Sequence, residues 1–205
     1  MKVGHRLRST ARQARERKQF GRARAWSRRR TGALAIFLLL AATPRLRAEE
    51  ATPVEYQVKA AFLLNFAKFI EWPADVFQDE KAQITICILR YDPFGHSLDE
   101  ILRGKTVNNR QVVARRIVEA EELSACQIVF VSEREEKHLP EVLNRLKGSS
   151  VLVAGETGTF AERGGGIQFF LEDHRLRFAV NVDAIRKARL TVSSKLLALA
   201  KIVHD

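Results

Sequence analysis

The sequence is poor in several residue types on which common kinds of functional site depend. Of its 205 residues, only two are cysteines, and neither lies in a CxxC motif. The five histidines are scattered, without an HExxH motif and without a histidine–cysteine cluster at ligand spacing. We therefore predict no metal site.

The chain also lacks an apolar run long enough to cross a bilayer. Residues 32–42 form an apolar run of eleven residues, which as a helix would rise about 16 Å, roughly half of a ~30 Å hydrocarbon core. That length is typical of the h-region of a signal peptide. The run follows Arg28–Arg30 and precedes a candidate cleavage site after Ala48. We expect a signal peptide over residues 1–48, export to the periplasm, and a mature chain that does not span the membrane.

Other interpretations of this leader stay open. It could be a basic tail beside a short buried helix, a retained signal anchor, or the product of an overextended gene start. The residues Arg-Arg-Arg-Thr-Gly at 28–32 resemble a twin-arginine signal. The export route is therefore undecided between the general and the twin-arginine pathways.

The positive charge of the chain belongs to this leader. The formal net charge is +11, yet residues 1–48 hold 14 Lys/Arg and one acidic residue, whereas residues 49–205 hold 21 basic and 23 acidic residues. The body of the protein is therefore slightly acidic, and its charge argues against a nucleic-acid-binding domain.

The remaining chain, residues 49–205, is predicted to be a single α/β domain. A helical pattern covers residues 54–72, β-branched runs at 84–89, 128–131 and 151–153 indicate buried strands, and an alternating run at 111–117 indicates a more exposed one. Short helices are expected at 94–102 and 139–146, a hairpin from strands 167–171 and 176–182, and helices at 183–189 and 193–203. We expect a three-layer α/β/α sandwich with a central mixed sheet, a C-terminal hairpin and a final helix.

The apolar surface of the helix at 54–72 is wider than one stripe. Such a helix is buried on two sides, either inside the domain or between subunits.

Cys87 and Cys126 both flank strand patterns. In an oxidising compartment an even number of cysteines favours a disulfide, although two buried free thiols are the alternative.

No catalytic constellation emerges from the sequence. The glycine-rich segment 155–166 matches neither GxGxxG nor GxxxxGK[ST], and a strand follows it, so a loop that positions this strand is favoured over a phosphate site. At residues 191–195 the spacing is wrong for an S-x-x-K nucleophile, and Thr191 or Ser193 is better explained as a helix N-cap. We predict a protein that is not an enzyme and binds no cofactor.

Polar residues gather in and beside the predicted loop and hairpin of the C-terminal third. Arg177 should face away from the apolar set Leu176, Phe178 and Val180, because side chains alternate along a strand. Arginines on a sheet rim suit the recognition of carboxylates, with a solvated surface of ordinary ion pairs as the alternative. The candidate binding residues are Glu156, Arg163, Arg175, Arg177 and Asn181.

Several motifs, in order along residues 54–203, resemble the YfiR-like family. They are VKAAFLLNFAKFIEWP at 58–73, ITICIL at 84–89, Gly-Glu at 155–156, ERGG at 162–165, RFAVN at 177–181 and SSKLL at 193–197. The resemblance implies an exported α/β protein that acts as a dimer in the periplasm. It also implies pairing of Cys87 with Cys126, whereas a second disulfide of some members would lie near 160–170, where this chain has no cysteine.

The resemblance further implies repression of a membrane-anchored diguanylate cyclase through its periplasmic sensor domain. Our leading hypothesis is a non-enzymatic homodimeric regulator whose partner is the periplasmic domain of an inner-membrane diguanylate cyclase or sensor kinase. The alternative is a periplasmic small-molecule binding module with its ligand near Arg175 and Arg177.

Overall fold

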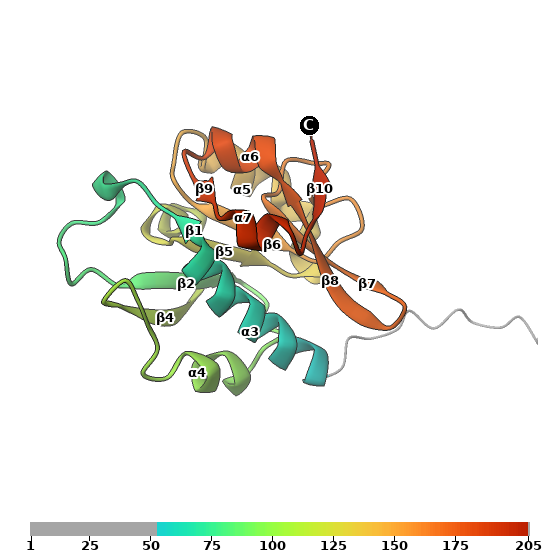
Figure 1. Ribbon diagram of the computed structural model, residues 1–205, viewed down its shortest axis with the longest axis horizontal. Helices are drawn as coiled ribbons and strands as arrows, with labels where there is room; N and C mark the ends of the chain where they lie inside the picture. The colour runs from blue at the N-terminus through green and yellow to red at the C-terminus, as the bar shows by residue number, and fades with distance from the viewer. Residues whose placement is uncertain (1–52, 205) are drawn as a thin grey trace, which may run out of the picture. The chain divides into compact units, whose positions relative to one another are not determined.

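The computed structural model describes residues 53–204, which are built around an eight-stranded mixed sheet (Figure 1). The strand order is β10-β8-β7-β6-β5-β2-β4-β3. The strands are β2 (Ile84–Leu89), β3 (Thr106–Val107), β4 (Arg110–Ile117), β5 (Ile128–Val131), β6 (Leu152–Gly155), β7 (Ile167–Glu172), β8 (Arg175–Asn181) and β10 (Lys201–Val203). A separate two-stranded pair joins β1 (Ile70–Glu71) to β9 (Thr191–Val192). The predicted signal peptide at 1–48 lies outside the described residues.

Helices cover both faces of the sheet. The α-helices are α3 (Pro53–Phe69), α4 (His96–Leu102), α5 (Leu139–Arg145), α6 (Val182–Lys187) and α7 (Ser194–Leu197), and three 3-10 segments are η1 (Ala74–Val76), η2 (Ala120–Ala125) and η3 (Glu133–His138). Helices α3 and α4 pack against one face, and α5 packs against the other with η2 and η3. The predicted α/β/α sandwich is confirmed.

The central strands run parallel and are buried on both sides. Strand β2 pairs in parallel with β4 and β5, β5 with β6, and β6 with β7, whereas β8 runs antiparallel to β7. Along β2, Ile86 and Ile88 face α3, while Leu89 faces α5. The continuous apolar runs therefore reflect a parallel sheet covered on both faces.

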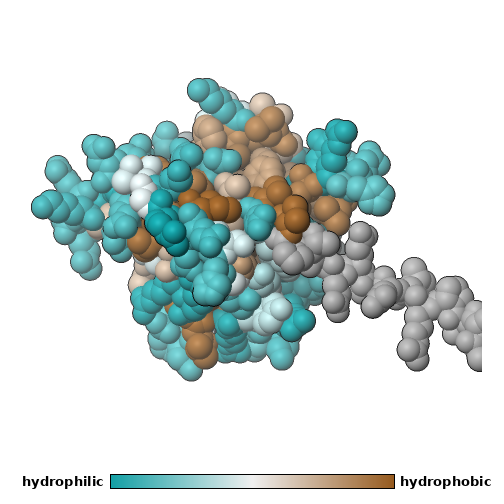
Figure 2. Space-filling view, turned by 90° about the horizontal axis from the view of Figure 1, so that it is seen from below, coloured by the Kyte–Doolittle hydropathy of each residue, from teal (hydrophilic) through white to brown (hydrophobic). Residues whose placement is uncertain are grey.

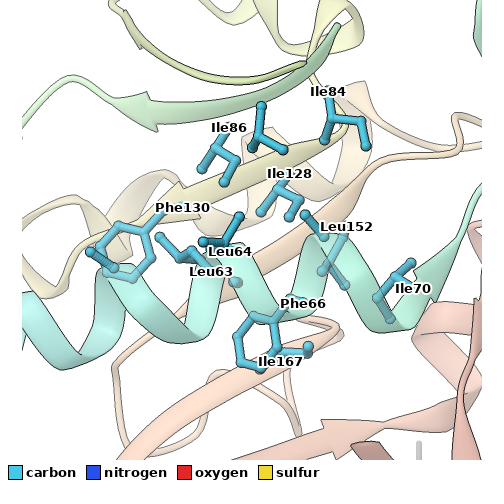
Figure 3. Packing of buried hydrophobic residues seen from close by; sticks show 14 of the residues in the cluster. Leu63, Leu64, Phe66, Ile70, Ile84, Ile86, Ile128, Phe130, Leu152 and Ile167 are labelled. Atoms are coloured by element: carbon cyan, nitrogen blue, oxygen red, sulfur yellow. The ribbon is translucent and has the colours of Figure 1, made fainter. Parts of the chain in front are cut away.

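The larger core lies between α3 and the sheet, where aromatic rings pack closely. The Phe66 ring centroid is 5.6 Å from that of Phe169 and 5.3 Å from that of Phe178. Figure 3 shows Leu63 and Leu64 of the same helix directed at Ile128 of the sheet. This packing fixes α3 across the sheet and thereby positions the N-terminal turn of the helix.

The smaller core contains the disulfide. Cys87 in β2 and Cys126 just before β5 are bonded, with their Cα atoms 5.9 Å apart. The predicted pairing is confirmed, and it joins neighbouring strands on the α5 side of the sheet.

The end of the chain differs from the prediction. In place of one helix over 193–203, α7 ends at Leu197 and the chain continues as strand β10, parallel to β8. Backbone pairing with the open edge of β8 overrides the helical spacing of the apolar residues. Leu199, between α7 and β10, is 70% exposed.

The first helix is also shorter than expected. It ends at Phe69, because Ile70 and Glu71 pair with β9 and the Ser193 amide donates a hydrogen bond to the Phe69 carbonyl.

Candidate functional site

The carboxyl ends of the parallel strands form one polar edge of the domain. The chain passes from β2 to β4 on one side and then to β5 on the other, so the strand order reverses between β2 and β5. In open α/β sheets, the crevice at such a point is the usual ligand position. Arg90 follows β2, Ser132 and Glu133 follow β5, and Glu156 follows β6.

Glu156 is held in a buried network at this edge. Its Oε2 accepts a hydrogen bond from Lys59 Nζ at 2.6 Å, and its Oε1 accepts from Tyr56 Oη at 3.2 Å and from the Glu133 amide at 2.9 Å. Lys59 Nζ is also 2.6 Å from Glu55 Oε1. The side chains of Lys59 and Glu156 are only 4% and 6% exposed.

This network stabilises the fold, and its polar groups are already bonded to one another, so they are not available to bind a ligand. Burial, followed by the Glu156 carboxylate, raises the pKa of the Tyr56 phenol well above its usual value, so the phenol stays protonated and donates its hydrogen bond. Both Glu156 oxygens are already bonded, and the Lys59 ammonium lies between two carboxylates. The cluster attaches the start of α3 to the ends of β5 and β6.

The charged groups around the point where the strand order reverses are more exposed to solvent than the Glu156 network. Arg90 Nη1 lies 2.8 Å from His138 Nε2, and Arg90 Nε donates to the Val118 carbonyl at 3.1 Å. The Arg134 guanidinium lies 4.2 Å from the Tyr91 ring centroid. This part of the edge is therefore a solvated polar surface.

Arg116 is part of the same edge and is held by two carboxylates. It pairs with Asp92 at 2.8 Å and with Asp99 at 2.7 Å. The hydrogen bond from Arg116 lowers the pKa of the Asp99 carboxyl. These pairs connect β4 to the loop before α4 and to α4 itself.

The five candidate residues do not meet in one place. Arg175 and Arg177 are exposed on the β7–β8 hairpin, where Arg177 Nε lies 2.9 Å from Glu172 Oε2, and Arg163 pairs with Glu136 of η3. The predicted outward orientation of Arg177 is confirmed.

Asn181 lies at the other end of β8 and is fully buried. Its side-chain oxygen accepts hydrogen bonds from the amides of Asp183 and Ala184, and its Nδ2 donates to the Ala161 carbonyl at 2.7 Å. It serves as the N-cap of α6 and joins that helix to the glycine-rich segment.

Several exposed apolar residues lie on the α3 side of the sheet. Val54 and Val58 are 65% and 41% exposed and share one stripe of α3 with the half-buried Phe62. Leu171 and Ile202 are also exposed. We call Val54, Val58, Leu171 and Ile202 the α3-side apolar surface.

Strand pairing places these residues on a common face. Leu171 of β7 is paired with Leu176 of β8, which lies two residues before Phe178. The ring centroid of Phe178 is 5.5 Å from that of Phe62 in α3. Ile202 is paired with Val180, again two residues from Phe178. Residues two apart point to the same face of a strand. Figure 2 shows apolar patches, in brown, within a mostly hydrophilic surface.

This exposed surface was not predicted from the sequence. The feature that points to it is the wide apolar surface of the helix at 54–72, which we predicted to be buried either within the domain or between subunits. The structure places the inner stripe in the core and leaves Val54 and Val58 at the surface.

Two solved structures are similar to parts of this chain. One is the ABC domain in complex with L-Trp from Streptococcus pneumonia, with 10% identity and a TM-score of 0.41, over 58% of this chain and 55% of that one. The other is a conserved domain protein from Vibrio cholerae, with 10% identity and a TM-score of 0.40, over 59% of this chain and 54% of that one. The chain thus spans just over half the length of each.

A family model, DUF4154, described as YfiR/HmsC-like, matches residues 56–201. Members of that family are periplasmic regulators and not enzymes. Across residues 53–204, no helix has the length and apolar character that crossing a membrane requires. The match includes most of α3, the polar edge and the hairpin, and the chain belongs to the YfiR/HmsC-like family.

Proposed function

We propose that this protein is a non-enzymatic periplasmic regulator that represses a membrane-anchored signalling protein, namely a diguanylate cyclase, by binding its periplasmic sensor domain. The observation that carries the proposal is the family match over residues 56–201, which spans nearly all of the described domain. The protein acts as a homodimer and restrains cyclic-di-GMP synthesis from the periplasmic side of the membrane.

The contact with the partner is centred on the α3-side apolar surface. Stable interfaces bury about 800 Å² on each partner and combine an apolar centre with a polar rim. Val58 of α3 and Leu171 of the hairpin supply apolar area at its centre.

Capture from solubilised membranes tests the proposal. The wild-type protein should recover a diguanylate cyclase, and deletion of its gene should raise cyclic-di-GMP. Val58→Asp and Leu171→Asp should each lower the recovery at least about tenfold, because each places a charge at an interface centre that is depleted of charge. The matched control is Val118→Asp, since Val118 is 59% exposed and follows β4, outside the proposed surface.

Three results would contradict the proposal. One is the recovery of no cyclase and no sensor kinase together with unchanged cyclic-di-GMP in the deletion strain. A second is a loss of capture in Val118→Asp equal to that in Val58→Asp. A third is a monomeric mass by light scattering at the concentration used for capture, which would contradict the homodimer.

A further inference from the structure

A cleft lies between α5 and α6, away from the polar edge and from the proposed partner surface. It has a volume of about 230 Å³. Its apolar walls come from α5, the turn after it, β6, α6 and the segment after α6, with Leu143, Leu146, Val153, Ile185 and Leu190 among them.

The charged residues that line this cleft are both lysines. Lys147 and Lys187 lie at its rim, and none of the described residues that line it is acidic. Because the walls are apolar, burial of an apolar group in the cleft makes the binding free energy more favourable. Attraction between an anionic head group and a lysine at the rim adds to this free energy.

Glycines help to shape the wall on the β6 side. A Cβ at Gly164 would lie 3.3 Å from Leu143 Cδ1, and one at Gly166 would lie 3.0 Å from Leu152 Cδ1. The leucines that line the cleft therefore pack directly against glycine backbone.

We infer that this cleft binds a small amphiphilic anion, which places its apolar body between α5 and α6 and its carboxylate beside Lys147. The volume lies below the ~300–1,000 Å³ of drug-sized ligand sites, so the ligand has a single short apolar chain or ring. Lysines are also favourable at helix C-termini for reasons unrelated to a ligand. The test must therefore separate these two roles.

Three probes with the same chain and different head groups provide that separation. The protein is purified as the cell produces it. Octanoate, 1-octanol and octylammonium are then titrated into it, and the amide chemical shifts are followed by NMR. Octanoate should bind at least about fivefold more tightly than 1-octanol, as expected for two unit charges about 4 Å apart under water-like screening. Octylammonium should bind most weakly. The shifts should concentrate at Gly148, Gly164 and Gly166.

Two variants and one control complete the experiment. Ala188→Leu fills the cleft and should abolish octanoate binding, while Lys147→Glu should weaken it at least about fivefold. Lys105→Glu changes an exposed lysine that is not among the cleft residues and should leave binding unchanged. The melting temperature of each variant, together with Lys147→Gln as a milder change, shows whether a loss of binding comes from unfolding.

Several outcomes would overturn the inference. Equal affinity for octanoate and 1-octanol would indicate an apolar hollow without preference for an anion. Equal weakening by Lys105→Glu would indicate a general effect of net charge. Amide shifts away from the cleft, or full binding by Ala188→Leu, would place the ligand elsewhere. None of these results depends on the proposed partner.

Discussion

At the scale of single residues, Glu156 shows how a candidate binding group becomes part of the fold. A carboxylate that follows a strand is a reasonable binding residue, and Glu156 was predicted to be one. Its partner Lys59 lies 97 residues away in the sequence, so no local pattern connects the two. Only the packing of α3 over the sheet brings the ammonium within 2.6 Å of the carboxylate.

We expect Glu156→Gln to lower the free energy of unfolding by about 2 kcal/mol. A fully uncompensated buried charge costs ~3–5 kcal/mol, but Glu55 still accompanies Lys59 in this variant. Urea unfolding at neutral pH measures the change. The matched control is Glu172→Gln, which removes the exposed ion pair with Arg177 and should cost no more than about 0.5 kcal/mol. Equal losses in both variants would show that burial does not set the strength of the Lys59 pair.

At the scale of elements, the turn segment between β6 and β7 is built around one aromatic ring. Phe160 is fully buried, and its ring lies between Gly155 and Gly165. A Cβ at Gly155 would lie 2.2 Å from a ring carbon of Phe160, and one at Gly165 would lie 2.1 Å from another. From the sequence these glycines were predicted to form a loop that positions the next strand, and in the structure they also leave room for the ring.

Gly165→Ala should therefore lower the free energy of unfolding by about 2 kcal/mol or more, because the ring cannot move without disturbing the smaller core. Gly158→Ala is the matched control, since no atom lies within 4 Å of its added Cβ. That variant should change stability by no more than about 0.5 kcal/mol. Thermal unfolding followed by circular dichroism measures both. A neutral Gly165→Ala would mean that the ring does not fill the space between the glycines.

Also at the scale of elements, the carboxyl ends of α3 and α7 show where helical periodicity misleads. Ile70 and Glu71 continue the pattern of α3, and Leu199 to Val203 continue that of α7, yet both segments are strands or lead into strands. In each case a backbone partner, β9 or β8, is available for pairing. Side-chain spacing contains no information about such a partner.

At the scale of the whole molecule, the disulfide connects β2 to the start of β5 and closes a loop with a sequence separation of 39. In the loop-entropy account, such a cross-link stabilises the folded state by about 4 kcal/mol. The Cys87→Ala/Cys126→Ala variant should lose up to that amount while keeping the far-ultraviolet circular dichroism of the wild type. Urea unfolding measures the loss, and wild type treated with reductant serves as the comparison. A fully unfolded variant would show that the two hydrophobic cores cannot sustain the domain alone.

The sequence by itself determined the class of fold, the central strands and the family, and the family resemblance implied the pairing of Cys87 with Cys126. These follow from apolar periodicity and from motifs in a fixed order, which are properties of neighbouring residues. Tertiary structure alone decided that Glu156 and Asn181 serve the fold, that Phe160 lies between two glycines, and that the chain ends in a strand. It also decided which apolar residues of α3 remain at the surface. Each of these depends on groups far apart in the chain, whose proximity arises only when the sheet and its covering helices pack together.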